Sequence, residues 1–283
     1  MAQFTGDAKA PRRAHDLPVC HRLHHRRVMG RAVLVFALGV VLGACSSTPG
    51  EPAEDPISVD VSLPSLSPVT NAVTRQPPLL PKGADVIAIP NQRYTRMWGR
   101  PAHDHSAFTL DTRNPVGKIS PMLIADAKRR DGRAWFEVLL PLRPNGATAW
   151  VREKDVTLRQ IHERIEIDLS ERVLRYFVDD ELEERLRVGV GTEATPTGIG
   201  RFYVWVKVHY ASPYQPYGIA ALGLSGFSPV LSEWPGGGRM AIHGTTSPTD
   251  RGNAVSHGCV RVLNEQLEAL LHVPLGTPVE ITA

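Results

Sequence analysis

Two histidines and a cysteine lie close together near the C-terminal end of the sequence. His243 follows the apolar run Met240–Ile242, and a loop rich in Gly, Pro, Ser and Thr separates it from His257 and Cys259. A thiolate is a strong nucleophile. A neutral imidazole beside a thiol can remove the proton of the thiol. An imidazolium lowers the pKa of the thiol to about 3.5–7.5. These residue types therefore predict a site for nucleophilic catalysis.

The spacing predicts different roles for the two histidines. His257 stands two positions before Cys259, so in an extended strand both side chains share a face, which suits a helper in the wall of the site. His243 arrives from a separate strand end and faces the sulfur, which makes it the better general base. Gly258 lets the backbone approach closely, and its amide, with that of Cys259, is predicted to bind the oxyanion of a tetrahedral intermediate.

The other cysteines do not supply a disulfide partner for Cys259. The chain of 283 residues holds three cysteines, and Cys20 lies in a leader that we expect processing to remove. Cys45 closes Leu-Gly-Ala-Cys, which resembles the lipobox of bacterial lipoproteins. A lone thiol in an oxidising compartment is a liability unless it is used, which favours a catalytic role for Cys259.

Residues 1–45 predict an export signal that ends in a lipid anchor. A basic region ends at Arg31, an apolar run spans Ala32–Leu42, and small residues precede Cys45. The run is too short to cross a bilayer, which takes about 20 apolar residues. We expect lipid on Cys45 to attach the protein to the outer face of the cytoplasmic membrane; an ordinary cleaved signal is the alternative.

The charge distribution argues against a nucleic-acid partner. The formal net charge is +3, but residues 1–44 carry seven Lys or Arg against two Asp, which leaves −2 for the remainder. A nucleic-acid-binding protein gathers its basic residues on the folded part instead.

Residues 46–158 divide into a tether and a small β module. Residues 46–81 hold eight prolines in 36 residues, which predicts a disordered, semi-extended tether. Residues 82–158 alternate short apolar runs with turn residues, and Pro144-Asn145-Gly146 is a turn signal between Trp135–Val138 and Ala149–Val151. These runs resemble the second half of a bacterial SH3-type barrel.

Residues 160–283 predict a second, mainly β domain with one late helix. Runs with a period of two predict strands over residues 164–169, 173–178, 182–190, 200–210 and 278–282. A helix is predicted over residues 265–272, capped by Asn264 and stopped before Pro274. The pattern is typical of a β-sandwich or an open barrel.

The segment His209–Gly238 shows no clear period. A segment of this length without periodicity inside a compact domain usually has a function, so we interpret it as a lid or substrate wall. Tyr217 and Trp234 are its candidate substrate contacts. The alternative is a surface excursion that packs its own aromatic residues.

Two motifs give the site a specific resemblance. Residues 242–245 (IHGT) and 256–261 (SHGCVR) closely resemble the signature of the L,D-transpeptidase catalytic domain, the YkuD-like family of peptidoglycan cross-linking enzymes. The similarity extends from about Arg164 to Thr282 and includes the TPTG segment Thr195–Gly198. The resemblance implies a YkuD-like β-sandwich in which Cys259 is the nucleophile.

The same resemblance assigns further roles. His243 is implied to be the general base, with its ring held by the carbonyl of Gly244. His257 and Gly258 are implied to shape the oxyanion hole. Ser256 is expected to contact substrate. Arg261 is implied to support the site or to contact a substrate carboxylate, and it stands where many members carry Asn.

The implied substrates are peptidoglycan stem peptides. Cys259 attacks the carbonyl of the third residue of a tetrapeptide stem, releases D-alanine and forms a thioester, which an amine of a second stem resolves. Water as acceptor makes the protein an L,D-carboxypeptidase. Carbapenem-type β-lactams are expected to acylate Cys259, and no metal or organic cofactor is required.

These residue types also suggest three other interpretations, each with a feature against it. An NlpC/P60-type cysteine peptidase places its cysteine before its histidine, whereas His243 precedes Cys259 here. A zinc site formed by His243, His257 and Cys259 lacks an obvious fourth ligand. A non-catalytic, wall-binding lipoprotein has no need of an intact nucleophile, base and glycine.

Overall fold

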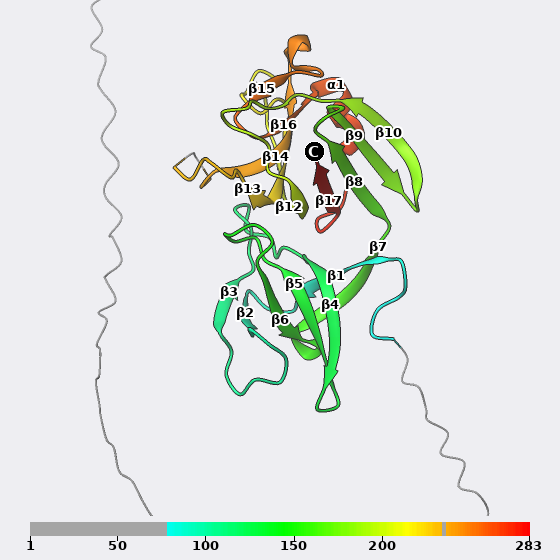
Figure 1. Cartoon of the computed structure of the whole chain (residues 1–283), viewed down its shortest axis with the longest axis vertical. Helices are drawn as coiled ribbons and strands as arrows, with labels where there is room; N and C mark the ends of the chain where they lie inside the picture. Colours follow the sequence, from blue (N-terminus) through cyan, green and yellow to red (C-terminus); the bar gives the residue numbers. More distant parts are fainter. Residues whose placement is uncertain (1–77, 234–235) are drawn as a thin grey trace, which may run out of the picture. The chain divides into compact units, whose positions relative to one another are not determined.

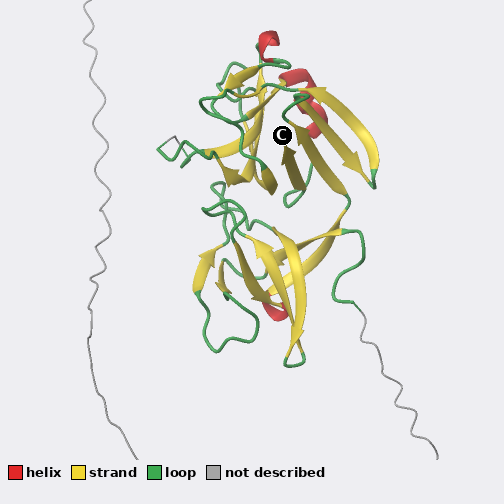
Figure 2. Ribbon diagram, in the orientation of Figure 1, coloured by secondary structure: helices red, strands yellow, loops and turns green. Residues whose placement is uncertain are grey.

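The structure is a computed structural model that describes residues 78–233 and 236–283. The predicted signal, Cys45, nearly all of the tether and Trp234 lie outside these residues. Residues 71–283 fall in one compact unit, whose described part is built mostly of strands with one short α-helix (Figure 2). The prediction of a mainly β protein is confirmed. No helix in the described ranges is long and apolar enough to cross a membrane.

The first sheet has five strands in the order β6-β5-β4-β1-β7 (Figure 1). These strands are β1 (Asp85–Pro90), β4 (Met122–Arg130), β5 (Arg133–Leu139), β6 (Thr148–Arg152) and β7 (Val156–Ile161). Strands β2 (Tyr94–Met97) and β3 (Phe108–Asp111) pair with each other, and the 3-10 turn η1 (Glu153–Asp155) leads into β7. The SH3-type assignment of this region stays a prediction.

The second sheet has eight strands in the order β10-β9-β8-β17-β12-β13-β14-β16. These strands are β8 (Glu163–Asp168), β9 (Val173–Val178), β10 (Glu181–Arg187), β12 (Gly200–His209), β13 (Ala220–Phe227), β14 (Arg239–Thr245), β16 (Val260–Leu263) and β17 (Pro278–Thr282). A separate parallel pair joins β11 (Val190–Gly191) to β15 (Ala254–Ser256). The strands predicted between residues 164 and 210 and at 278–282 are therefore present, with small shifts at their ends.

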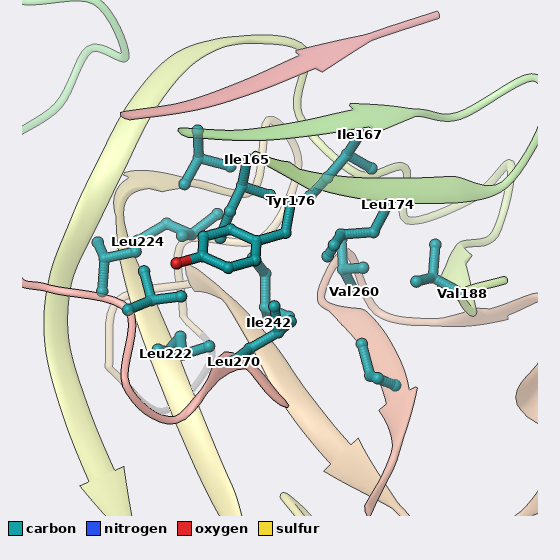
Figure 3. Packing of buried hydrophobic residues seen from close by; sticks show 14 of the residues in the cluster. Ile165, Ile167, Leu174, Tyr176, Val188, Leu222, Leu224, Ile242, Val260 and Leu270 are labelled. Carbon is teal, nitrogen blue, oxygen red and sulfur yellow. The ribbon is translucent and has the colours of Figure 1, made fainter. Parts of the chain in front are cut away.

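The strands of the second sheet contribute to one cluster of buried apolar side chains. Figure 3 shows side chains from both halves of the sheet converging on Tyr176, which is almost fully buried. Ile165 and Leu174 come from β8 and β9, while Leu222 and Ile242 come from β13 and β14. Burial of such side chains supplies most of the driving force for folding and holds the strands that carry the site in fixed register.

Strand β13 corrects the interpretation of His209–Gly238 as irregular throughout. All eight residues of Ala220–Phe227 are buried, and the strand pairs with β12 on one side and β14 on the other. Glycines hide its period: a Cβ on Gly223 would lie 2.6 Å from Val206, and one on Gly226 would lie 2.3 Å from the ring of Phe202. These positions are glycine because neighbouring side chains occupy the space, which apolar periodicity cannot reveal.

The late helix is shorter than predicted. The helix α1 spans Asn264–Leu267 and continues as the 3-10 turn η3 (Glu268–Leu270). Asn264 does not cap it: the side-chain oxygen accepts the backbone N–H of Ile219 at 3.1 Å, and the amide nitrogen donates to the carbonyl of Pro213 at 3.4 Å. The side chain that was expected to start a helix instead holds the segment before β13.

Candidate active site

His243 and Cys259 are brought together by two adjacent parallel strands. In the register of β14 and β16, Ile242 pairs with Val260 and His243 with Arg261. Cys259 immediately precedes β16, and its thiol receives a backbone hydrogen bond from Ala241, two residues before His243. His243 and Cys259 therefore arrive from separate strands that pair with each other, as predicted. The prediction that the His243 ring faces the sulfur stays a prediction.

The ring of His243 is held on two sides. Its Nδ1 donates to the carbonyl of Gly244 over 2.9 Å, the contact that the family resemblance implied. Tyr217 meets the imidazole edge to face, with ring centroids 5.1 Å apart, and itself stacks on Tyr210 at 6.0 Å. Because Nδ1 carries the hydrogen, Nε2 is left with the lone pair that a general base needs.

Burial sets the protonation states of the pair. His243 is only 3% exposed, and this burial lowers its pKa to about 4, with the bond to Gly244 partly opposing the effect. Burial also raises the pKa of the Cys259 thiol, against the backbone hydrogen bond from Ala241 and the positive charge of Arg261. At neutral pH the site therefore holds a neutral imidazole and a protonated thiol. The expectation that an imidazolium lowers the thiol pKa is not met at His243.

Ser256 organises the turn that precedes Cys259. Its hydroxyl donates to the carbonyl of Cys259 at 2.6 Å and accepts the amide of Gly258 at 3.1 Å. The Ser256 carbonyl in turn accepts the amide of Thr192 at 3.1 Å and the hydroxyl of Thr195 at 3.0 Å. Ser256 is 2% exposed, so its hydroxyl supports the turn internally, which differs from the predicted substrate contact.

The same turn changes the expectations for His257 and Gly258. Residues 257 and 258 form a bend in which Gly258 has a φ of 112°, so the alternation of an extended strand does not apply to His257 and Cys259. The side chain of His257 is exposed. The Gly258 amide donates to Ser256 in this structure, which leaves the amide of Cys259 as the remaining backbone donor of the predicted pair.

An ion pair that sequence reasoning missed anchors Arg261. Its Nη1 lies 3.2 Å from Oδ2 of Asp250, whose side chain is 8% exposed, and the hydroxyl of Thr245 donates to the same oxygen at 2.7 Å. Arg261 also exchanges backbone hydrogen bonds with Gly189, both at 2.8 Å. Asp250 stands in the polar loop between the two motifs, where a lone carboxylate carries no periodic signal.

Gly244 is needed for close packing as well as for its carbonyl. A Cβ at this position would lie 2.1 Å from the side-chain oxygen of Asn264 and 3.1 Å from Gly218. Its amide donates to the carbonyl of Tyr217 at 3.0 Å. The glycine thereby brings the Tyr217 segment against the end of β14. Trp234, the other aromatic candidate, lies outside the described residues.

Metal ligation finds no support in the described ranges. No group of three or more His, Cys, Asp or Glu side chains there is arranged to hold a metal ion. Cys259 is the free cysteine of this part of the chain, and it is half-buried. The site thus combines a free thiol with a buried histidine whose pKa is lowered.

Comparison with known families gives the site a context. Residues 162–281 match the sequence model of the YkuD family, described as the L,D-transpeptidase catalytic domain. This match confirms the resemblance inferred from the two motifs, and its limits agree closely with the predicted extent.

Curated relatives carry the same description. "Putative L,D-transpeptidase YkuD" of Bacillus licheniformis is 35% identical over 120 residues, which cover 42% of this chain and 65% of that protein. "Probable L,D-transpeptidase ErfK/SrfK" of Salmonella typhimurium is 31% identical over 163 residues, which cover 51% of this chain and 52% of that protein. The chain thus spans less than two thirds of the length of these relatives.

Solved structures include a catalytic domain from E. faecium L,D-transpeptidase acylated by ertapenem. It has a TM-score of 0.34 and 24% sequence identity, and the match covers 44% of this chain and 99% of that domain.

Proposed function

We propose that the protein is a peptidoglycan L,D-transpeptidase in which Cys259 is the nucleophile and His243 the general base. The observation that carries the proposal is the hydrogen bond from Nδ1 of His243 to Gly244, on the strand that pairs with the one following Cys259. This hydrogen bond fixes the tautomer whose Nε2 accepts a proton. His243 and Cys259 lie in the two motifs that resemble the family signature.

The first half of the reaction forms a thioester. Nε2 of His243 takes the proton of the Cys259 thiol as Sγ attacks the carbonyl carbon of the third residue of a donor stem. The carbonyl electrons move onto oxygen, where the amide of Cys259 stabilises the charge. The imidazolium then returns its proton to the nitrogen of the departing D-alanine as the C–N bond breaks.

The second half transfers the acyl group. A side-chain amine of an acceptor stem attacks the thioester carbonyl and gives a proton to His243. The C–S bond breaks, the proton returns to sulfur, and a new amide joins the third residues of two stems. With water in place of the amine, the same steps release a shortened stem, the L,D-carboxypeptidase alternative.

Burial keeps His243 unprotonated at neutral pH, which a general base requires, but it also makes the imidazole a weaker base. A base with a pKa of about 4 is unprotonated at neutral pH, so it is ready to accept the thiol proton without prior ionisation. An NlpC/P60-type cysteine peptidase stays the less favoured alternative because of the order of its residues.

The test is incubation with a carbapenem followed by peptide mapping. Because a strained β-lactam carbonyl acylates an activated thiol, we expect one added mass on the peptide that contains Cys259, and none in the Cys259→Ala variant. Release of D-alanine from tetrapeptide stems should also be lost in that variant while its circular dichroism spectrum is retained. An unmodified Cys259 peptide, or full transfer by the variant, would refute the proposal.

We also propose that Cys45 carries a lipid and attaches the protein to the outer face of the cytoplasmic membrane. The support is the basic region, the apolar run and the lipobox-like residues of the leader. The intact mass of the native protein should equal that of a chain that begins at Cys45 and carries a lipid on that residue. A soluble product cleaved at another position would exclude the anchor.

A further inference from the structure

One connection of the first sheet contacts the second sheet close to the candidate site. Between β5 and β6, the guanidinium of Arg143 donates to three backbone carbonyls: Ser228 at 3.1 Å, Leu231 at 2.9 Å and Gly237 at 3.0 Å. The same group lies over the ring of Phe227, 4.6 Å from its centroid. One side chain of the first sheet thus binds several points of the segment that follows β13.

Asn145, two positions further on, secures the end of β13. Its amide nitrogen donates to the carbonyl of Phe227 at 2.7 Å, and its oxygen accepts the Phe227 amide at 2.9 Å. A backbone residue whose N–H and C=O are both bonded has the restraint that a neighbouring strand would provide. Asn145 therefore restrains Phe227 just before the chain turns at Ser228.

The turn Phe227–Leu231 lies against the residue before the nucleophile. Ser228 is buried, and its hydroxyl accepts the amides of Val230 at 3.3 Å and Leu231 at 3.1 Å. A Cβ built on Gly258 would lie 3.7 Å from that hydroxyl oxygen and 3.8 Å from the Ser228 Cβ. The Ser228 side chain thus borders the space next to Gly258, on the bend that precedes Cys259.

We propose that Arg143 and Asn145 are positioning residues that hold the turn Phe227–Leu231 as a wall of the Cys259 site. The consequence for catalysis rests on the proposed function, whereas the restraint on the turn does not. Arg143 suits this task because its planar guanidinium offers several donors in a fixed arrangement, which a lysine does not. The first sheet thereby helps to shape a site whose reacting groups all come from the second.

Hydrogen exchange of the full-length protein tests the restraint. In Arg143→Ala and in Asn145→Ala, the amides of Val230 and Leu231 should exchange at least about tenfold faster. The hydrogen bonds that hold the backbone of Phe227, Ser228 and Leu231 are lost, so the turn opens more often. Arg143→Lys should give a smaller increase. The control is Arg201→Ala, which removes an ion pair between Arg201 of β12 and Asp85 of β1 without contacting the turn.

Reactivity of Cys259 tests the catalytic consequence. The rate constant for acylation by a carbapenem should fall several-fold in Arg143→Ala, because the wall beside the bound molecule is displaced. Alkylation by iodoacetamide, which needs little of that wall, should stay close to that of the parent protein. A merely structural role would change both rates together.

The outcomes separate the two proposals. Unchanged exchange at Val230 and Leu231 in Arg143→Ala, or an equal increase in Arg201→Ala, overturns the positioning role. Failure of the parent protein to react with the carbapenem overturns the proposed function instead, and the exchange experiment still decides whether Arg143 and Asn145 restrain the turn.

Discussion

Arg261 and Asp250 form an ion pair beneath the candidate site, with Nη1 and Oδ2 3.2 Å apart. The arginine comes from β16, two residues after Cys259, and the aspartate from the 3-10 turn η2 (Pro248–Asp250). The carboxylate also accepts the hydroxyl of Thr245 at the end of β14. One buried side chain therefore links both strands that carry the reacting residues.

Removal of this carboxylate should destabilise the protein. Asp250→Ala leaves the Arg261 guanidinium, 28% exposed, without its partner, so we expect the free energy of unfolding to fall by about 1–3 kcal/mol. Urea titration followed by circular dichroism measures the change. Asp126→Ala is the matched control, because it breaks an exposed pair with Lys128 and should cost less than about 1 kcal/mol. Equal losses in both variants would contradict the anchoring role of Asp250.

The two histidines should contribute unequally to catalysis. His243→Ala removes the proposed base and should reduce the acylation rate by about 10²–10⁴-fold. His257→Ala alters an exposed side chain on the bend and should have a smaller effect. Stopped-flow measurement of carbapenem acylation compares the variants. A larger loss of rate in His257→Ala than in His243→Ala would show that His243 is not the base.

The acylation rate should fall on the acid side only at a pH well below the ordinary pKa of histidine. The base works only when unprotonated, and burial lowers the pKa of His243 to about 4, so the acylation rate should be level at neutral pH and fall below pH of about 4. At the alkaline end the thiolate forms only above its usual range, because burial raises the Cys259 pKa. Single-turnover rates across the pH range provide the measurement. An acid limb near pH 6.5 would instead indicate a base exposed to solvent.

Adding one methyl group at Gly226 of β13 should destabilise the protein. Gly226→Ala would put a Cβ 2.3 Å from ring carbons of the buried Phe202, and we expect a loss of about 1–3 kcal/mol of stability. Gly99→Ala is the control, since its Cβ meets nothing within 4 Å and should change stability by less than about 0.5 kcal/mol. Thermal unfolding of both variants gives the comparison, and similar melting temperatures would show that Phe202 moves aside freely.

Strand β8 was predictable because its apolar side chains alternate and only one of its faces is deeply buried. Ile165 and Ile167, for example, face the core while their neighbours are partly exposed. Strand β13 was not predictable, because it is buried on both faces and uses Gly223 and Gly226 to admit neighbouring side chains. A fully buried strand has no alternation to detect.

Residue type and motif were enough to single out Cys259 and His243 as the candidate nucleophile and base, but their surroundings were not predictable. The protonation of His243 depends on how deeply β14 is buried, which no local pattern reports. Asp250, Asn264 and Asn145 act through long-range contacts with Arg261, Ile219 and Phe227. Short polar side chains in loops read from sequence as turn formers or helix caps, so their partners become visible only in the fold.

The order of strands in the second sheet has a consequence for how the protein folds. Strand β17 lies between β8 and β12, so it joins the half that contains β8, β9 and β10 to the half that contains β12, β13, β14 and β16. Its partner β8 stands more than a hundred positions earlier in the chain. Forming this pair closes a long loop. The conformational entropy lost on closure is offset only once the strands are in contact, so folding is slow. Deletion of Pro278–Thr282 should therefore leave two half-sheets that expose apolar faces, and an intermediate lacking this strand is the species at risk of aggregation.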